Sequence, residues 1–169
     1  MIDNISIVIP SFNESLNIDE LYNRLVKTII KNNIKNYEVI FVDNGSTDNS
    51  LELLTKLNKL DSSVKVISLS RNFGYQNAIL AGLKYTSNDY VCVIDGDLQD
   101  PPEIISEFIN KIKDGYDVVY GIRKKRDSTL LKKICYKIFY EIYTKFSEID
   151  VPKQAGEFCL MKRKIVNII

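Results

Sequence analysis

The chain has 169 residues, of which 45% are hydrophobic and 27% are charged, and its net charge at neutral pH is +1. These values are ordinary for one soluble globular domain with a well-buried core. The chain has no histidine, which excludes Ser-His and Cys-His nucleophilic catalysis and histidine metal ligands. Its three cysteines are widely spaced and lack a C-x-x-C pair, so neither a disulfide framework nor a zinc site is expected.

Strands and helices are predicted to alternate along the sequence. Apolar runs predict strands at residues 5–9, 39–42, 64–69, 90–94 and 118–120. Between them, apolar residues at helical spacing predict helices around residues 21–30, 51–57, 78–83 and 102–112. This order, without an internal repeat, predicts an α/β fold with three layers, α/β/α, around a mostly parallel central sheet with right-handed crossovers.

The fourth predicted strand ends in the triplet Asp95-Gly96-Asp97. The apolar run before it is typical of a parallel strand that is covered on both faces, and ligands of open α/β sheets bind beyond the carboxyl ends of such strands. Oxygen ligands at that edge suit a hard divalent cation, which in turn suits a diphosphate. A chain with 13 aspartates contains a D-x-D about once by chance, so the triplet carries weight only in its context.

Acidic and amide side chains also follow the first two predicted strands, as Asn13-Glu14 and Asp43-Asn44. A parallel sheet brings these two loops and the triplet to one edge. Turn and helix-cap chemistry is the competing explanation for any single loop, and it weakens when all three coincide. The absence of G-x-G-x-x-G and G-x-x-x-x-G-K-[ST] motifs counts against a dinucleotide-binding Rossmann domain and a P-loop NTPase. Phosphate is therefore expected to be held by a metal and by side chains.

The net charge conceals an asymmetry along the chain. Residues 1–122 contain 11 Lys and Arg against 17 Asp and Glu, whereas residues 123–169 contain 12 against 5. The basic part predicts an anionic partner surface, and within it residues 130–146 have the pattern of a basic amphipathic helix. Such a helix can lie on an anionic membrane or pack on its own domain. A nucleic acid partner is disfavoured, because the acidic part surrounds the predicted site.

Targeting and spanning segments are not apparent in the sequence. The start of the chain lacks the basic residues of a signal peptide and leads directly into a strand. No apolar run approaches the eighteen or so residues that span a bilayer. We therefore expect a cytoplasmic location, at the inner face of the cell membrane.

Five motifs follow the predicted strands and their loops. They are VIPSFNE (residues 8–14), VDNGSTD (42–48), RNFGYQNA (71–78), DGDLQDPPE (95–103) and YGIR (120–123). In this order and spacing they resemble glycosyltransferase family 2, which has the GT-A nucleotide-sugar fold, and within it the branch that loads a sugar onto a polyprenyl phosphate. The resemblance runs from about Ile5 to the end of the chain.

The resemblance implies a binding site for a nucleotide-sugar donor, with UDP or GDP as the nucleotide. The family positions that hold the base and ribose are matched by Pro10, Phe12, Glu14, Val42, Asp43 and Asn44. The positions that contact ribose and hold Mg²⁺ or Mn²⁺ on the diphosphate are matched by Asp95, Asp97 and Gln99, with Gly96 between the two aspartates. Arg123 matches a residue on the donor diphosphate, with a solvated surface charge as its alternative.

The reaction that the resemblance implies is an inverting displacement of the nucleoside diphosphate by an acceptor oxygen. A polyprenyl phosphate already carries negative charge at neutral pH, so its attack needs a weak base or none. The family's acidic segment on the acceptor side corresponds here to residues 154–159, where Glu157 keeps the acid while Gln154 and Cys159 depart from the pattern. Glu157 is expected to be a base or an acceptor-side residue, or else an exposed loop acid.

The expected organisation is one catalytic domain over residues 1–169. Residues 1–122 would form the nucleotide-sugar-binding half, and residues 123–169 a partial acceptor and membrane-facing half, truncated at its C-terminus relative to the polyprenyl branch. Asp97, Arg123 and Glu157 are the residues expected to act on the reacting groups. Two other functions stay open: a soluble transferase that extends a cell-surface polysaccharide, and a non-catalytic domain that binds nucleotide or membrane.

Overall fold

The computed structural model of the chain describes residues 2–122 and 155–169. Residues 1–119 and 157–169 form one compact unit, and residues 120–156 form a second, of which only 120–122 and 155–156 are described. Arg123 and the predicted amphipathic helix at residues 130–146 lie outside the described residues. Within the described residues, every helix is too short or too polar to cross a bilayer.

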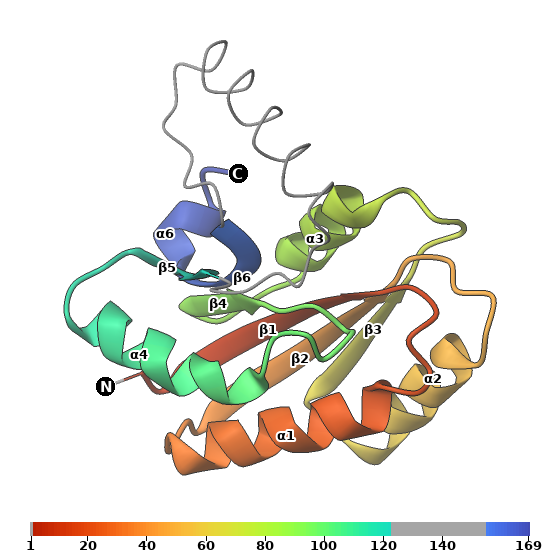
Figure 1. The fold of residues 1–169 in the computed structure, drawn as a ribbon, viewed down its shortest axis with the longest axis horizontal. Coiled ribbons are helices and arrows are strands. Elements are labelled where there is room, and N and C mark those ends of the chain that lie inside the picture. Colours follow the sequence, from red (N-terminus) through yellow and green to blue (C-terminus); the bar gives the residue numbers. More distant parts are fainter. Residues whose placement is uncertain (1, 123–154) are drawn as a thin grey trace, which may run out of the picture. The chain divides into compact units, whose positions relative to one another are not determined.

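A six-stranded sheet forms the middle layer of the fold (Figure 1), with the strand order β3-β2-β1-β4-β6-β5. Strand β1 pairs in parallel with β2 and β4, and β2 pairs in parallel with β3, whereas β6 is antiparallel to β4. The prediction of an α/β fold with a mostly parallel sheet is therefore confirmed. The strands are β1 (Asn4–Ser11), β2 (Asn36–Asp43), β3 (Val64–Ser68), β4 (Tyr90–Val93), β5 (Val118–Ile122) and β6 (Ala155–Lys162).

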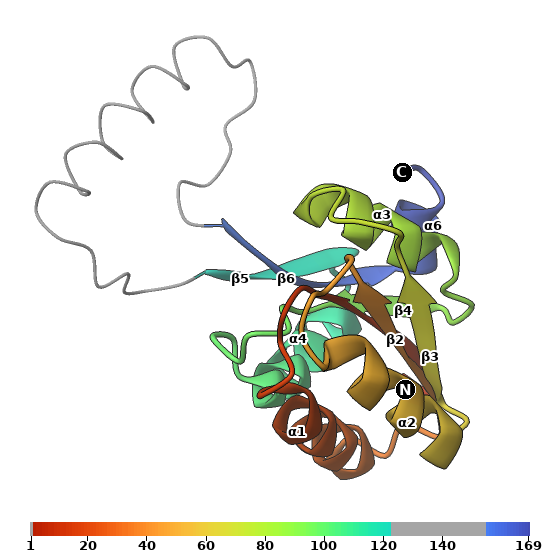
Figure 2. The ribbon, with the colours of Figure 1, turned by 90° about the vertical axis from the view of Figure 1, so that its right-hand side faces the viewer.

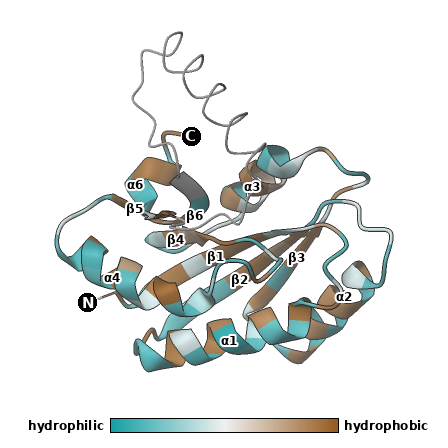
Figure 3. Ribbon diagram, viewed as in Figure 1, coloured by the Kyte–Doolittle hydropathy of each residue, from teal (hydrophilic) through white to brown (hydrophobic). Residues whose placement is uncertain are grey.

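Helices cover both faces of the sheet, as the two views in Figure 1 and Figure 2 agree. One face carries α1 (Ile18–Lys31), α2 (Ser50–Leu60) and α4 (Ile105–Lys113), the last preceded by the 3₁₀ turn η1 (Pro102–Ile104). The other face carries α3 (Tyr75–Lys84) and the short α6 (Arg163–Val166). Helices α1 and α4 each bury one stripe, and Figure 3 shows α1 with alternating hydrophobic and hydrophilic bands.

Two hydrophobic clusters result, one on each face. Ile5, Ile7 and Ile9 of β1 join the cluster under α1, α2 and α4, whereas Val8 joins the cluster under α3. This alternation follows from the period of two residues in a strand. Because both faces are covered, the central strands consist of apolar runs rather than an alternation of apolar and polar residues.

Helix α3 lies unusually close to the sheet at Gly82. A Cβ atom at this position would come within 2.4 Å of Val8 Cγ1 and 3.0 Å of Val42 Cγ2. Only a residue without a side chain allows this approach without movement of the sheet or the helix. Gly82 therefore sets the distance between α3 and strands β1 and β2.

Strand β6 is the element that the sequence analysis did not predict. Residues 154–159 were expected to form an acceptor-side segment or to leave Glu157 in an exposed loop, but β6 spans Ala155–Lys162 and α6 begins at Arg163. The reason is the short apolar run Phe158–Met161, whose members alternate between the two clusters: Phe158 and Leu160 enter one and Met161 the other. A buried strand this short has no periodicity that distinguishes it from a helix start.

Candidate active site

A cavity of about 450 Å³ lies beyond the carboxyl ends of β1, β2 and β4. Its volume is within the usual range for small-molecule sites, and its place is the one expected for ligands of open α/β sheets. Four of the residues around it are acidic. The lining residues are Pro10, Ser11, Phe12, Glu14, Asn44, Asn72, Tyr75, Asp95, Gly96, Asp97 and Glu157.

Most of the residues that were predicted to bind the donor lie together in this lining, namely Pro10, Phe12, Glu14, Asn44, Asp95, Gly96 and Asp97, and Glu157 joins them. Three others do not line the cavity. Val42 is buried in the cluster under α3, and the buried Asp43 accepts a hydrogen bond through Oδ1 from the backbone N–H of Ser46 at 3.3 Å. The backbone N–H of Gln99 donates to Asp97 Oδ1 at 3.0 Å.

Hydrogen bonds connect the loop after β1, the first loop at the cavity, to the loop after β2, the second. The backbone N–H of Asn13 donates to Ser46 Oγ at 3.0 Å, and the N–H of Thr47 donates to Asn13 Oδ1 at 2.8 Å. The N–H of Glu14 donates to Ser50 Oγ at 2.9 Å. Asn13 has a φ of 59°, a left-handed conformation that asparagine tolerates better than most residues. These bonds fix the backbone at Asn13 and Glu14, directly after Phe12.

The second loop is fastened in turn to the segment before α3. The buried Asn44 accepts a hydrogen bond through Oδ1 from the N–H of Phe73 at 3.0 Å and donates through Nδ2 to Asn72 Oδ1 at 3.2 Å. Gly45 has a φ of +74°, and a Cβ there would lie 2.5 Å from the Arg71 carbonyl carbon. Glycine is therefore required at this position for two reasons: the positive φ, and the close approach of the Arg71 backbone.

The third loop holds a strained residue next to the acidic triplet. Leu98 has a φ of 60°, which is rare for a residue with a bulky side chain. Its side chain packs against the cluster under α1, α2 and α4, which provides the compensating contact. Such conformations cost about 1–3 kcal/mol and occur preferentially at functional sites. In this loop the turn at Leu98 directs the chain away just after Asp97.

Strand β6 brings Glu157 to the cavity from the far end of the sequence. In the antiparallel ladder Val93 pairs with Cys159, so the same register, continued by two residues, sets Glu157 opposite Asp95. The Gln76 side chain donates through Nε2 to Glu157 Oε1 at 2.7 Å. Because β6 was not predicted, this pairing could not be expected from the sequence.

Three lining residues, Ser11, Asn72 and Tyr75, had no predicted role. Tyr75 donates its hydroxyl hydrogen to the carboxylate of Asp95. Burial, the hydrogen bond to Asp95 and the carboxylate of Glu157 raise the pKa of Tyr75 above its usual range, so the phenol keeps its proton. Both Asn72 and Tyr75 belong to the RNFGYQNA motif, which was the available signal in the sequence.

The donor set suits a divalent cation that also takes ligands from a substrate. Asp95 and Asp97 supply carboxylate oxygens on one wall of the cavity, and these are the ligands that Mg²⁺ and Mn²⁺ prefer. Within residues 2–122 and 155–169, no three acidic or cysteine side chains are grouped closely enough to hold an ion alone. Magnesium commonly binds to one or two carboxylates together with substrate phosphates, which fits this arrangement.

The family model Glycosyl transferase family 2 matches residues 6–168 of the chain. An uncharacterized glycosyltransferase of Bacillus subtilis, YkcC, is 47% identical over 161 residues, which are 95% of this chain and 50% of that protein. An undecaprenyl-phosphate 4-deoxy-4-formamido-L-arabinose transferase of Yersinia pestis is 42% identical over 133 residues, covering 78% of this chain and 40% of that one. The chain spans about half the length of the curated relatives it matches.

Solved structures give the same fold. Staphylococcus aureus TarS 1-349 in complex with UDP-GlcNAc has a TM-score of 0.58 and 26% identity, over 75% of this chain and 37% of that one. The mannosyltransferase PcManGT of Pyrobaculum calidifontis, in complex with GDP-Man and Mn²⁺, has a TM-score of 0.67 over 97% of this chain and 46% of its own. At 15% identity, the second match is evidence of a shared fold alone.

Proposed function

Because the chain belongs to glycosyltransferase family 2, we propose that it binds a nucleotide-diphosphate sugar in the cavity beyond β1, β2 and β4 and transfers the sugar to an acceptor. The observation that carries this proposal is the convergence on one cavity of Glu14, from the loop after β1, with Asp95 and Asp97, from the loop after β4. UDP-GlcNAc in the structurally similar TarS, at 26% identity, supports a UDP sugar as the donor, and a GDP sugar is the alternative that the sequence motifs leave open.

The base and ribose of the donor are proposed to lie against the first two loops. The half-exposed ring of Phe12 offers an apolar face for a base, and Glu14 and Asn44 can accept or donate hydrogen bonds to base N–H groups and ribose hydroxyls. Asp43 has an indirect role, because its carboxylate accepts the hydrogen bond that fixes the turn at Ser46. Val42 is also indirect: it is buried in the cluster under α3 and anchors the strand that leads to Asn44. The nucleotide is thus held by loops that are themselves fastened to one another.

The diphosphate is proposed to lie near the acidic triplet. Asp95 and Asp97, with Gln99, would hold Mg²⁺ or Mn²⁺, and Arg123 would donate charge-assisted hydrogen bonds to the phosphates. A bound ion neutralises the charge that develops on a departing diphosphate. The hydrogen bond from the N–H of Gln99 to Asp97 Oδ1 orients that carboxylate.

The proposed reaction is a single inverting displacement. The acceptor oxygen attacks the anomeric carbon opposite the diphosphate, a new carbon–oxygen bond forms, and the bond to the diphosphate breaks with its electron pair leaving on the diphosphate. A polyprenyl phosphate is the proposed acceptor, supported by the undecaprenyl-phosphate transferase among the relatives. Its phosphate is already anionic at neutral pH, which leaves Glu157 the role of a weak base or an acceptor-side contact.

Calorimetry with UDP and with GDP, each with and without Mn²⁺, tests the donor site. We expect one of the two nucleotides to bind at least tenfold more tightly when Mn²⁺ is present, because the acidic wall repels the diphosphate until a cation bridges them. ADP serves as the control for recognition of the base. Nucleotide binding that is absent, or that is indifferent to the metal, would contradict the proposal.

A transfer assay tests the acceptor. Undecaprenyl phosphate in vesicles with and without anionic lipid is compared with a soluble oligosaccharide as acceptor for the same sugar donor. Transfer to the lipid phosphate is expected, and the proposed contact of residues 130–146 with the inner face of the membrane predicts faster transfer on anionic vesicles. Transfer to the oligosaccharide alone would replace the proposal by the extension of a cell-surface polysaccharide.

A further inference from the structure

We infer that Tyr75 is a positioning residue of this site, whose hydroxyl holds the Asp95 carboxylate in place next to Glu157. The inference rests on the proposed function, since Asp95 matters for catalysis only if it holds a cation and a donor. Tyr75 belongs to the RNFGYQNA motif, most of which has no role in the proposed donor binding. The structure supports this inference with three independent features: a fixed backbone, a close helix and a pair of acids.

The backbone before Tyr75 is fixed by side chains rather than by a regular element. Asn72 Oδ1 accepts hydrogen bonds from the N–H of Gly74 at 2.8 Å and from Asn44 Nδ2 at 3.2 Å. Asn44 itself is buried and also binds the N–H of Phe73. The residue that starts α3 is therefore placed by the end of β2, which is also a wall of the cavity.

The close approach of α3 to the sheet at Gly82 fixes the other end of the same helix. With both ends of α3 held, the Tyr75 side chain has a defined starting point. It reaches over the end of β4 and donates to Asp95, twenty residues further along the chain. Tyr75 also packs against the cluster under α3, which restricts the rotation of its ring.

Two carboxylates meet near this hydroxyl. Asp95 and Glu157 both line the cavity, and the interactions of both with Tyr75 raise the pKa of its phenol, after the larger effect of burial. The hydroxyl donates to one of these two carboxylates, that of Asp95, and this hydrogen bond fixes the direction of that carboxylate at the cavity. A tyrosine can serve in this way because its hydroxyl remains a donor over the physiological pH range.

The next residue in the chain serves the second acid. Gln76 donates to Glu157 Oε1 at 2.7 Å, so the first turn of α3 holds one carboxylate with each of two successive side chains. Partners that orient the ligands of a metal typically change metal affinity by about 10- to 100-fold when they are removed. We therefore expect Tyr75 to affect the metal-dependent part of donor binding, and Gln76 to affect it little.

The test compares Tyr75→Phe with Tyr85→Phe, which removes a hydroxyl from an exposed tyrosine at the other end of α3. The measurement is the affinity for UDP and GDP with and without Mn²⁺, together with the melting temperature of each variant. For Tyr75→Phe we expect the gain in affinity from Mn²⁺ to fall by about tenfold or more, with the metal-free affinity changed by less than about threefold. Tyr85→Phe should leave the gain as it is.

The outcomes separate this inference from the proposed function. If the unaltered chain shows no gain from Mn²⁺, the proposed function is wrong and the inference falls with it. If the unaltered chain shows the gain and a folded Tyr75→Phe keeps it in full, only the inference is overturned.

A double-mutant cycle of Tyr75→Phe with Asp95→Ala, measured by chemical denaturation without ligand, checks whether Tyr75 acts through Asp95. Strictly additive effects would contradict the inference. A purely structural role for the ring would leave the cycle additive, since Tyr75→Phe retains the ring.

Discussion

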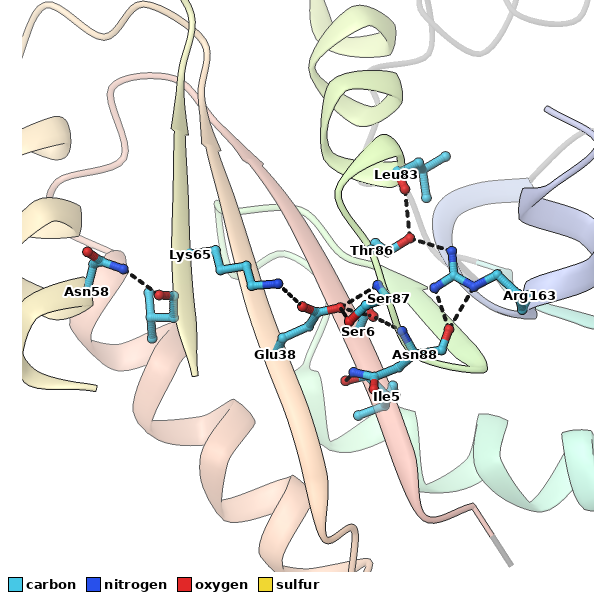
Figure 4. Close-up of polar contacts among 11 residues, drawn as sticks. Ile5, Ser6, Glu38, Asn58, Lys65, Leu83, Thr86, Ser87, Asn88 and Arg163 are labelled. Atoms are coloured by element: carbon cyan, nitrogen blue, oxygen red, sulfur yellow. Dashed lines mark hydrogen bonds and ion pairs between the residues drawn. The ribbon is translucent and has the colours of Figure 1, made fainter. Parts of the chain in front are cut away.

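The two ends of the parallel strands use carboxylates in opposite ways. Near the amino end of β2, Glu38 is only 5% exposed and its carboxylate accepts hydrogen bonds from Ser6 Oγ at 2.6 Å and from the N–H and Oγ of Ser87 at 2.7 and 2.9 Å, besides an ion pair with Lys65 (Figure 4). At the carboxyl ends, four acids face a cavity of about 450 Å³. The buried carboxylate of Glu38 stabilises the fold, whereas the acids around the cavity, although they also accept hydrogen bonds from the chain, line a space that a ligand can enter.

The amino end is also where distant segments are joined. Arg163 donates through Nε to the Asn88 carbonyl oxygen and through Nη1 to Thr86 Oγ1, both at 2.8 Å, and Asn88 Nδ2 donates to the Ile5 carbonyl oxygen at 2.9 Å. These contacts join α6, β1 and the loop that leads into β4, as Figure 4 shows. The comparison therefore predicts that substitutions at one end change stability and that substitutions at the other change binding and catalysis.

The largest effect is expected for Asp97→Asn. It keeps the shape of the side chain but removes a charge from the proposed cation site, so the sugar transfer rate should fall by about 10²- to 10³-fold. The melting temperature should change little, because Asp97 lines a cavity rather than the core. The control is Asp114→Asn on the exposed end of α4. A large fall in melting temperature, in addition to the fall in transfer rate, would contradict the proposed difference between the two ends of the strands.

The converse is expected for Glu38→Ala. It leaves Ser87 and the buried Ser6 without their acceptor, which should cost about 2–4 kcal/mol in the free energy of unfolding. Metal-dependent nucleotide affinity, measured well below the melting temperature, should be unchanged. Glu52→Ala on the exposed surface of α2 is the control. A weaker nucleotide affinity with unchanged stability would show that Glu38 acts on the site.

Acidic pH is expected to lower the stability that Glu38 provides at the amino end of the strands. Burial alone would raise the pKa of Glu38, but the hydrogen bonds from Lys65, Ser6 and Ser87 outweigh it and lower the pKa from its usual value of 4.5 to about 2. A depressed pKa in the folded state contributes stability above pH 4.5 that is lost as the pH falls toward 2. Urea denaturation at pH 6 and pH 3 should show the unaltered chain losing about 1–2 kcal/mol more than Glu38→Gln. Equal losses would contradict this assignment.

A smaller effect is expected at Gly45, compared with Gly115. Both have a positive φ, but a Cβ at Gly45 meets the backbone of Arg71 and Asn72, whereas a Cβ at Gly115 has nothing within 4 Å. Alanine should therefore cost about 1 kcal/mol more at Gly45 than at Gly115. It should also weaken nucleotide binding, because the displaced segment includes Asn72 in the cavity lining. Chemical denaturation and calorimetry on both variants measure the two effects, and equal costs would remove the role of the close contact.

The sequence was sufficient to predict the parallel part of the fold and the three loops at its edge. Apolar runs such as Ile5–Ile9 are long enough to identify buried strands, and a parallel order places their carboxyl ends together. Strand β6 could not be predicted, because only four consecutive apolar residues indicate it and its partner β4 is far away in the sequence. The role of Tyr75 could not be predicted for a related reason: its contact with Asp95 depends on how α3 packs on the sheet, and no local sequence pattern indicates that packing.

The seating of α3 at Gly82 has a consequence for natural variation in this chain. A single methyl group there would contact Val8 and displace α3 from the sheet, and the displacement would extend to the first residue of the helix, where Tyr75 donates its hydrogen bond to Asp95. Impaired variants are then expected well outside the cavity lining, at positions without any polar atom in their side chain. The space available between Gly82 and Val8 in the apolar interior would then limit how well the polar groups at the cavity are placed.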